Sequence, residues 1–392
     1  MTMTIDRTKI LKIFTWFSVA AVIIVITVIV LPKIKKTPPD YQPSSINHQP
    51  VQKTTLFFAG DIMLSRNVAD KIYKANDFSL PFQNVKNKIS AADISFANLE
   101  SPFNDTGSHF VPNSLVFNAD PKSIEGLIIA GFDILSTANN HALDQGLKGL
   151  DFTIQTLMDN GIIPTGTVKT EGEPVLPIIK KNDILYGILS YSYTAKNDGG
   201  KSSSPLINNF NDPEQMKQDI WEIRGHYADI VVVSMHAGTE YQRQPNQSQI
   251  DFAHAAIDAG ADLVIGHHPH WIQTIEEYKG RYIFYSLGNF VFDQMWSVET
   301  REGLTILVTL ESNSSVHPAL DAGSNQSKIP AFAGMGITKI ELNPVIIENY
   351  CCPRWATDEE SLEILKKINP HTKTNILVEN GKINSNWLNA IK

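Results

Sequence analysis

Short apolar runs recur along the chain, and most of them end in polar residues. A short apolar run bounded by Gly or by polar residues is typical of a strand buried in a sheet. Such runs predict strands at residues 56–58, 93–97, 132–136, 184–189, 228–234, 263–265 and 282–285. Two further strands are expected at residues 302–310 and 337–342.

Helical patterns separate several of these predicted strands. Apolar residues recur at helical spacing within residues 152–158, 215–227, 248–259 and 358–368. Strands that alternate with helices along a chain form layered α/β domains. We therefore expect one α/β domain, which we place at residues 54–368.

A different pattern occupies the N-terminus. Residues 13–31 contain no charged side chain, and three basic residues lie on each side of this stretch. A helix of that length spans the roughly 30 Å of hydrocarbon in a bilayer. No small-residue cleavage site follows, so we expect an uncleaved transmembrane signal anchor. The equal number of basic residues on its two sides leaves the orientation of the anchor open.

The segments around the anchor and the domain complete the predicted organisation. Residues 1–12 precede the anchor, and residues 32–53 contain several prolines among polar residues, which is typical of an extended linker. Residues 369–392 form a C-terminal extension for which the sequence indicates no function.

Composition changes this picture little but excludes some functions. The chain has 392 residues, of which 42% are hydrophobic and 19% charged, as in ordinary globular proteins. Its net charge is -8, and no basic cluster lies outside the N-terminus, so nucleic acid is not an expected partner. Cys351 and Cys352 are neighbours, and we expect them to be packing residues rather than a redox pair, because a ring between neighbouring residues is strained.

Polar side chains follow five of the predicted strands. Ligands of open α/β sheets bind outside the carboxyl ends of the strands, so these side chains are expected to share one edge. Imidazole, carboxylate and amide groups together are typical ligands of divalent transition metals. The expected metal ligands are Asp61, Asn98, Glu100, Asn140, His236, His268 and His270.

Each of these groups has a simpler interpretation when taken alone. Asp61 could cap a helix, Asn140 could begin one, and the histidines of residues 267–270 could lie in a polar surface loop. Neither a P-loop spacing nor a Gly-x-Ser-x-Gly nucleophile motif is present. The recurrence of such groups at five strand ends therefore favours a metal-dependent hydrolase over serine chemistry.

The predicted site is dinuclear. Two divalent ions, Mn, Zn or Fe, about 3.5–4 Å apart would bind a phosphate or an ester and stabilise the leaving oxygen. His141 would remain free to act as the general acid. Arg66, Asp144 and Glu240 lie in the same polar segments and are the other catalytic candidates.

Several of these segments together resemble a known family. Gly266-His267-His268-Pro269-His270 and Asn139-Asn140-His141 are similar to motifs of the CapA/PgsA proteins of capsule and poly-γ-glutamate synthesis. Four other segments match in the same order, at residues 59–66, 98–100, 236–241 and 285–294. The resemblance extends from about Thr54 to about Ile368. It implies a two-sheet α/β sandwich of the metallophosphoesterase type, with metals at the sheet edge.

The resemblance also implies roles for individual residues. Asp61 matches the first ligand motif, Asn98 or Glu100 the second, and Asn140-His141 the amide-histidine motif. His236 matches the isolated histidine, and His268-Pro269-His270 matches the final His-x-His motif.

Two positions depart from the pattern. Met63 stands where the phosphoesterase motif Asp-x-His has its histidine, so one ion would lose a ligand. Ala237 stands where members of the capsule family usually have Trp. These departures predict a weaker metal site or a mononuclear one.

The resemblance finally implies a location and partners. Members of the family are typically anchored in the cell membrane by a single span, with the large domain outside the cell. For this chain, the resemblance implies that residues 1–12 lie in the cytoplasm. A hydrolase or transferase acting on an anionic extracellular polymer or a phosphorylated precursor is then expected, beside capsule or poly-γ-glutamate synthase and export subunits. The alternatives are a non-catalytic accessory scaffold of an export complex and a soluble cytosolic phosphatase.

Overall fold

A computed structural model describes residues 53–172, 175–193, 204–312 and 335–368, together with two short strands at residues 378–379 and 382–383. The predicted cytoplasmic segment, anchor and linker, up to residue 52, lie outside the described residues, as does most of the C-terminal extension. Within the described part, no helix combines the length and the apolar character needed to cross a membrane.

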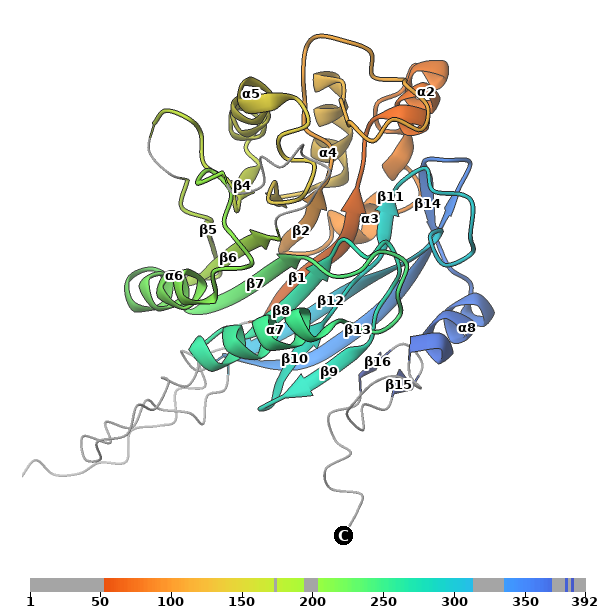
Figure 1. Ribbon diagram of the computed structural model, residues 1–392. Coiled ribbons are helices and arrows are strands. Elements are labelled where there is room, and N and C mark those ends of the chain that lie inside the picture. Colours follow the sequence, from red (N-terminus) through yellow and green to blue (C-terminus); the bar gives the residue numbers. More distant parts are fainter. Residues whose placement is uncertain are drawn as a thin grey trace, which may run out of the picture. The chain divides into compact units, whose positions relative to one another are not determined.

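The first sheet contains ten of the described strands (Figure 1). Its main path runs β15-β16-β13-β12-β1-β2-β3-β4, and β11 and β14 pair with β1 and β13. Strands β1 to β4 and β11 are parallel, whereas β12 to β16 pair antiparallel. The bounds are β1 (Lys53–Ile62), β2 (Ile94–Leu99), β3 (Ile134–Ser136), β4 (Ile163–Thr165), β11 (Asn289–Val291), β12 (Glu302–Ser312), β13 (Met335–Glu348), β14 (Cys352–Trp355), β15 (Val378–Glu379) and β16 (Lys382–Ile383).

The second sheet contains six strands in the order β5-β6-β7-β8-β10-β9. Strands β6, β7, β8 and β10 are parallel, and β5 and β9 add antiparallel edges. The bounds are β5 (Ile178–Lys181), β6 (Ile184–Ser192), β7 (Ile230–His236), β8 (Leu263–His267), β9 (Ile275–Tyr278) and β10 (Arg281–Phe284).

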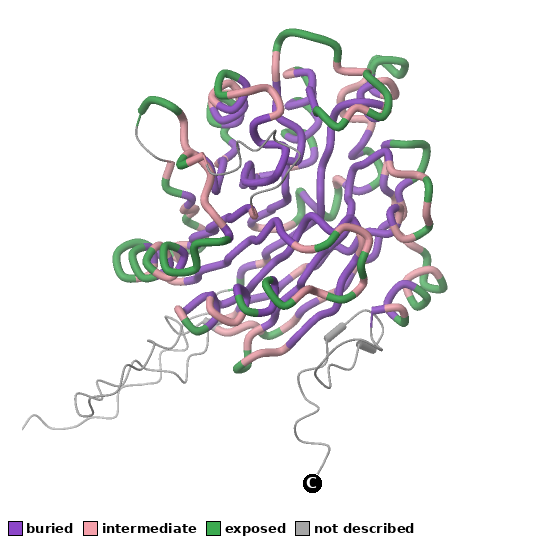
Figure 2. The backbone as a smooth tube through the Cα atoms, viewed as in Figure 1, coloured by how far each residue is buried: buried purple, intermediate pink, exposed green. Residues whose placement is uncertain are grey.

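The two sheets pack face to face through alternate residues of their strands. Leu56 and Phe58 of β1 lie in one apolar cluster with Val232 of β7 and Ile265 of β8. Phe57, between them in sequence, belongs to a different cluster on the outer face of the first sheet. Successive side chains of a strand point to opposite faces, so both faces of β1 are covered. The strands are accordingly buried along most of their length (Figure 2).

Helices cover the outer faces of both sheets. Val68 of α2 and Leu127 of α4 pack with Phe57 against the first sheet, and Ile220 of α6 and Ala253 of α7 pack against the second. The helices are α2 (Arg66–Ala75), α3 (Lys86–Ile89), α4 (Ile124–Ala130), α5 (Gly146–Asp159), α6 (Pro213–His226), α7 (Gln247–Ala259) and α8 (Asp358–Ile368), with 3-10 turns at η1 (Leu80–Phe82) and η2 (Pro121–Ser123). The predicted α/β fold is confirmed, and its layers are helices, sheet, sheet and helices.

The prediction for the two cysteines is wrong in one respect. Cys351 and Cys352 are joined by a disulfide bond between neighbours. They follow Asn349 and Tyr350, whose positive φ angles of 54° and 65° turn the chain tightly after β13. The side chain of Cys351 is also buried in the apolar cluster on the outer face of the first sheet, so the expected packing role holds alongside the bond.

Candidate metal centre

The carboxyl ends of parallel strands from both sheets meet at one edge. In the first sheet, Asp61 of β1 is the register partner of Asn98 of β2 and also of Asn289 of β11. In the second sheet, His236 of β7 is the register partner of His267 of β8. The His267 Nδ1 atom lies 3.3 Å from Asp61 Oδ1, so the two sets of strand ends are in contact.

Two glycines allow backbones to approach closely at this edge. A Cβ atom at Gly60 would lie 1.9 Å from the carbonyl oxygen of Gly288, and one at Gly266 would lie 1.9 Å from that of Tyr285. Asp61 N donates a hydrogen bond of 3.0 Å to the same Gly288 oxygen. Only glycine leaves room for these contacts, which position the residues on either side.

Asp61 is the buried acceptor at the centre of the site. Its carboxylate accepts hydrogen bonds from Asn98 Nδ2 at 2.8 Å and from the His268 backbone N–H at 3.2 Å. His267 Nδ1 and His270 Nδ1 lie 3.3 and 3.8 Å from its oxygens. Burial alone would raise the pKa of Asp61, but the contacts with His267, His270 and Asn98 outweigh it and lower that pKa. Asp61 is therefore held as a carboxylate.

Glu100 differs from Asp61 because it is buried without hydrogen bonds. Its side chain is 0% exposed, and neither oxygen has a hydrogen-bond partner among the described residues. The nearest histidine nitrogens, His141 Nε2 and His270 Nε2, are 3.8 and 3.9 Å from Oε1. Burial and the negative charges of Asp61 and Glu240 raise the pKa of Glu100 well above its usual range. Such an unsatisfied buried carboxyl is costly unless a cation neutralises it.

The described residues contain a group that fits such a cation. Asp61, Glu100 and His236 each offer one ligand atom, and these atoms all lie within 4.8 Å of one another. All three side chains are buried. Two carboxylates and an imidazole form a donor set suited to divalent ions such as Mn, Fe and Zn.

The imidazole of His236 is held by two amides. Asn98 Nδ2 lies 3.2 Å from its Nδ1 atom, and Asn140 Oδ1 lies 2.7 Å from its Nε2 atom. Asn98 is oriented in turn by Asn139, whose Nδ2 atom donates to Asn98 Oδ1 at 3.2 Å. Burial, the largest cause, lowers the pKa of His236 well below its usual range, so the ring stays neutral. Neutral imidazole is the form that binds metals.

His268 and His270 face the same edge from the loop after β8. Both have positive φ angles, of 96° and 58°, which point to a tightly turned backbone. His268 Nε2 lies 3.1 Å from Tyr193 Oη, and His270 Nδ1 lies 2.9 Å from Asn289 Oδ1. Burial lowers the pKa of His268 to about 3 and also lowers that of His270, so both rings are neutral near pH 7.

His141 lies beside this group in contact with a carboxylate and an aromatic ring. Its Nδ1 atom is 2.7 Å from Asp144 Oδ2. Its ring stacks on Phe117, with centroids 3.9 Å apart and an interplanar angle of 24°. The Nε2 atom is directed towards Glu100. The structure thus brings Asp144 to His141, as a partner for its second ring nitrogen.

The other two catalytic candidates lie at the margin of the site. Glu240 is half-buried, and after burial its negative charge is a further cause that raises the pKa values of Glu100 and Tyr241. Arg66 is buried and pairs with Asp293, and its positive charge opposes, without outweighing, the effect of burial on the pKa of Glu100.

Residues 55–294 match the family model of the bacterial capsule synthesis protein PGA_cap. The chain belongs to this family.

Two of its capsule relatives show how far the similarity extends. The PGA biosynthesis protein CapA of Bacillus subtilis is 34% identical over 262 residues, which cover 66% of this chain and 68% of that protein. The capsule biosynthesis protein CapA of Bacillus anthracis is 30% identical over 286 residues, 69% of this chain and 67% of that protein. Among solved structures, NAD nucleotidase from Haemophilus influenzae matches at 10% identity and a TM-score of 0.42, over 82% of this chain and 57% of that one. A likeness at this level supports no assignment of activity.

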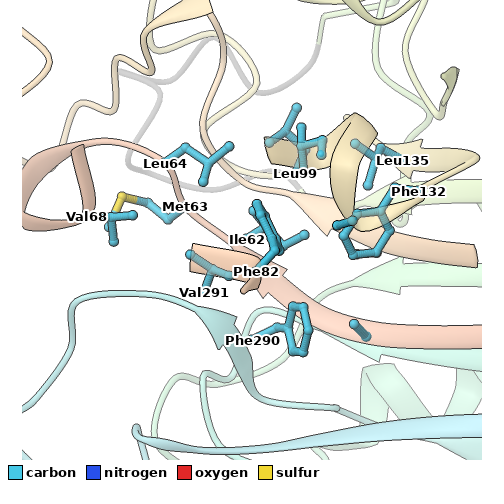
Figure 3. Packing of buried hydrophobic residues seen from close by; sticks show 14 of the residues in the cluster. Ile62, Met63, Leu64, Val68, Phe82, Leu99, Phe132, Leu135, Phe290 and Val291 are labelled. Carbon is cyan, nitrogen blue, oxygen red and sulfur yellow. The ribbon is translucent and has the colours of Figure 1, made fainter. Parts of the chain in front are cut away.

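In this capsule synthesis protein, Met63 stands in place of the histidine of the Asp-x-His motif, and its side chain lies away from the ligands. Met63 is fully buried among apolar side chains, including Leu64 and Val68 (Figure 3). It therefore offers no ligand to the site. His267, by contrast, is a buried histidine at the site that our sequence-based ligand set left out. Its position was predictable, because it has the same parity along β8 as the residues that face the other sheet.

Other residues of the site had weaker signals in the sequence. Asn289 follows an apolar strand within the 285–294 segment and contacts His270, a role that its position permits but does not specify. Phe117 and Tyr193 contact histidines of the site from loops or strand ends. Nothing in the local pattern around these two aromatic residues indicates such contacts.

Proposed function

We propose that this capsule synthesis protein is a divalent-metal-dependent hydrolase or transferase of the metallophosphoesterase type. The observation that carries the proposal is the buried, unpaired carboxyl of Glu100 beside Asp61 and His236. A fold gains nothing from such a carboxyl unless a cation occupies the space next to it. Functional sites are where such unsatisfied groups are retained.

Three residues would hold the first ion, namely Asp61, Glu100 and His236. His270 lies 3.9 Å from Glu100 and, together with His268 and Asn140, is available to a second ion. When bound, a divalent ion supplies Lewis-acid chemistry that stabilises negative charge on a phosphoryl or ester oxygen.

The protein's own residues supply binding and proton transfer. His141 would donate a proton from Nε2 to the leaving oxygen, since that atom faces Glu100 and the metal-ligand group. Asp144, at Nδ1 of the same ring, fixes the ring orientation. Asn98 and Asn140 contact the two ring nitrogens of His236 and hold the ring at the site, and one of these contacts would give way when the ring binds an ion.

The substrate and the location are part of the proposal. We place the large domain outside the cell membrane, anchored by residues 13–31, beside capsule or poly-γ-glutamate synthase and export subunits. The substrate would be the anionic extracellular polymer or a phosphorylated precursor of it. The names of the two Bacillus relatives and the uncharged length of residues 13–31 support this assignment.

A non-catalytic accessory role is the second candidate. The observation in its favour is Met63, which fills apolar space where a second ion would need a histidine. An accessory protein could keep one structural ion without turning over any substrate.

The test is metal-dependent hydrolysis by the full-length chain in detergent. Metal-free protein would be assayed with bis-p-nitrophenyl phosphate and p-nitrophenyl phosphate, before and after addition of Mn²⁺ or Zn²⁺. We expect activity that requires metal and falls at least 100-fold in Asp61→Asn and His236→Ala. His226→Ala is the matched control, because His226 is exposed on α6 away from the strand ends. Metal binding without turnover of either ester would favour the accessory role.

A further inference from the structure

Arg66 joins the loop of residues 104–120, which contacts His141 through Phe117, to the segment that follows β11. Its backbone N–H donates to the carbonyl oxygen of His109 at 2.7 Å, and its Nη1 atom donates to that of Ser114 at 3.1 Å. Its Nη2 atom pairs with Asp293, which follows β11. Asn67 strengthens this attachment by donating to the same carboxylate from its backbone and side-chain nitrogens.

The loop that Arg66 contacts carries Phe117, whose ring stacks on His141. The guanidinium carbon of Arg66 lies 4.8 Å from the centroid of the Phe117 ring, in cation–π geometry. The imidazole of His141 stacks on the same ring at 3.9 Å. Phe117 N donates at 2.5 Å to Asp144 Oδ2, which is also the oxygen that contacts His141 Nδ1. Loop, ring and carboxylate thus form one connected set around His141.

Arg66 uses two of its three guanidinium nitrogens to contact Ser114 and Asp293, and the third, Nε, is buried without a hydrogen-bond partner among the described residues. Its side chain is 10% exposed, and its charge is paired with Asp293. The segment between Phe103 and Pro121 contains no helix or extended strand, so its order depends on such attachments. A ring stacked at 3.9 Å restricts rotation of the imidazole, and a displaced loop would release it.

We propose that Arg66 is a positioning residue, which acts through Phe117 to hold the His141 ring in the orientation that protonates the leaving group. This inference rests on the proposed hydrolase function. It assigns to Arg66 a role in orientation, in place of direct contact with the reacting atoms. Phe117, which the sequence did not single out, is the residue through which Arg66 orients His141.

Leaving-group dependence tests this role. A p-nitrophenolate leaves without a proton, whereas an alkoxide or unsubstituted phenolate leaves poorly unless an acid protonates it. The full-length protein loaded with Zn²⁺ would be assayed with bis-p-nitrophenyl phosphate and with the matched diphenyl ester. We expect Arg66→Ala and Phe117→Leu to lower kcat for the diphenyl ester 10- to 100-fold, with less than threefold loss for the nitrophenyl ester and little change in KM. Arg66→Lys should recover part of the loss, and Phe117→Tyr most of it.

Two kinetic outcomes would overturn the role. Equal losses for both esters would mean that Arg66 supports the site as a whole. A raised KM with unchanged kcat would mean that Arg66 binds the substrate directly. The Zn²⁺ content of each variant, measured in parallel, shows whether the metal site has been kept.

A spectroscopic measurement separates this inference from the proposed function. In histidine-labelled, Zn²⁺-loaded protein, the ring nitrogen signals of His141 can be assigned by comparison with His141→Gln. Arg66→Ala should shift or broaden them, and Phe117→Tyr should not. If no ester is hydrolysed but these signals respond, the hydrolase proposal fails while the positioning contact stands. Signals that Arg66→Ala leaves unchanged would refute the positioning role.

Discussion

Replacement of Glu100 by Gln should have opposite effects on stability in the absence and presence of metal. Glu100 is 0% exposed with both oxygens unpaired, and burial raises its pKa well above the ordinary value of 4.5. Below about pH 4.5 the carboxyl is protonated in the folded and the unfolded chain and leaves stability unaffected. As the pH rises, the unfolded chain ionises first, so the metal-free protein loses stability.

The stability changes expected for Glu100→Gln amount to a few kcal/mol, as about 2 kcal/mol without metal and about 2.7 kcal/mol from metal binding. An unpaired buried carboxyl destabilises a fold by about 2 kcal/mol, and the neutral amide of Gln removes most of that penalty. For a domain of about 300 residues, 2 kcal/mol corresponds to a shift of about 3 °C in Tm. A metal present at about 100 times its Kd stabilises the wild-type domain by about 2.7 kcal/mol, or about 4 °C. Glu100→Gln should lose most of this second gain.

Thermal unfolding of the full-length chain at pH 7.5, with EDTA and with Mn²⁺, is the assay. Metal-free Glu100→Gln should melt about 3 °C above the wild type, and the order should reverse with Mn²⁺. Glu276→Gln is the matched control. Glu276 is also buried but accepts a hydrogen bond from Tyr285 and contacts His254, so its replacement should lower Tm in both conditions. A metal-free Glu100→Gln protein that melts below the wild type, or one that gains as much from Mn²⁺, would refute the reasoning.

Three further predictions concern the surroundings of the site. Burial lowers the pKa of His268 to about 3, so the metal-free fold loses stability as the pH falls below the unfolded value of 6.5, by about 2 kcal/mol at pH 5. His268→Gln should remove that loss when urea unfolding is compared at pH 7.5 and pH 5. An unchanged pH dependence would contradict this prediction. Asn289→Ala frees the His270 ring and should weaken Mn²⁺ binding about 10- to 100-fold by calorimetry, and an affinity equal to the wild type would show that the contact is dispensable. Gly60→Ala places a Cβ atom 1.9 Å from the Gly288 oxygen and should cost about 2–4 kcal/mol in urea unfolding, whereas a loss below about 0.5 kcal/mol would mean that β11 shifts freely.

Much of the site was predictable because it follows from strand ends. Asp61, Asn98 and His236 each close an apolar strand, and parallel strands bring their carboxyl ends to one edge. The sequence therefore predicted that these side chains share one edge, without any knowledge of distances. It could not indicate that Glu100 lacks a hydrogen bond, since that depends on the packing of every neighbour.

The contacts that orient His141 were beyond the reach of the sequence. Arg66 and Asp293 pair across 227 positions, and Phe117 reaches His141 from an irregular loop. Loops carry no periodic pattern, so their contacts leave no local signal. The helix α2 was also missed, because its charged residues hide the apolar face made by Val68 and Ile72. The disulfide between Cys351 and Cys352 runs against the expectation from ring strain, and it lies directly after the turn at Asn349 and Tyr350.

The central claim is that Asp61, Glu100 and His236 bind a divalent ion together. Anomalous scattering from crystals of the protein grown with Mn²⁺ and measured on both sides of the manganese edge tests it most directly. We predict an anomalous peak within about 2.0–2.4 Å of an oxygen of Asp61, an oxygen of Glu100 and a nitrogen of His236. A map with no peak at these three residues, at a Mn²⁺ concentration that loads other sites on the protein, would contradict the account.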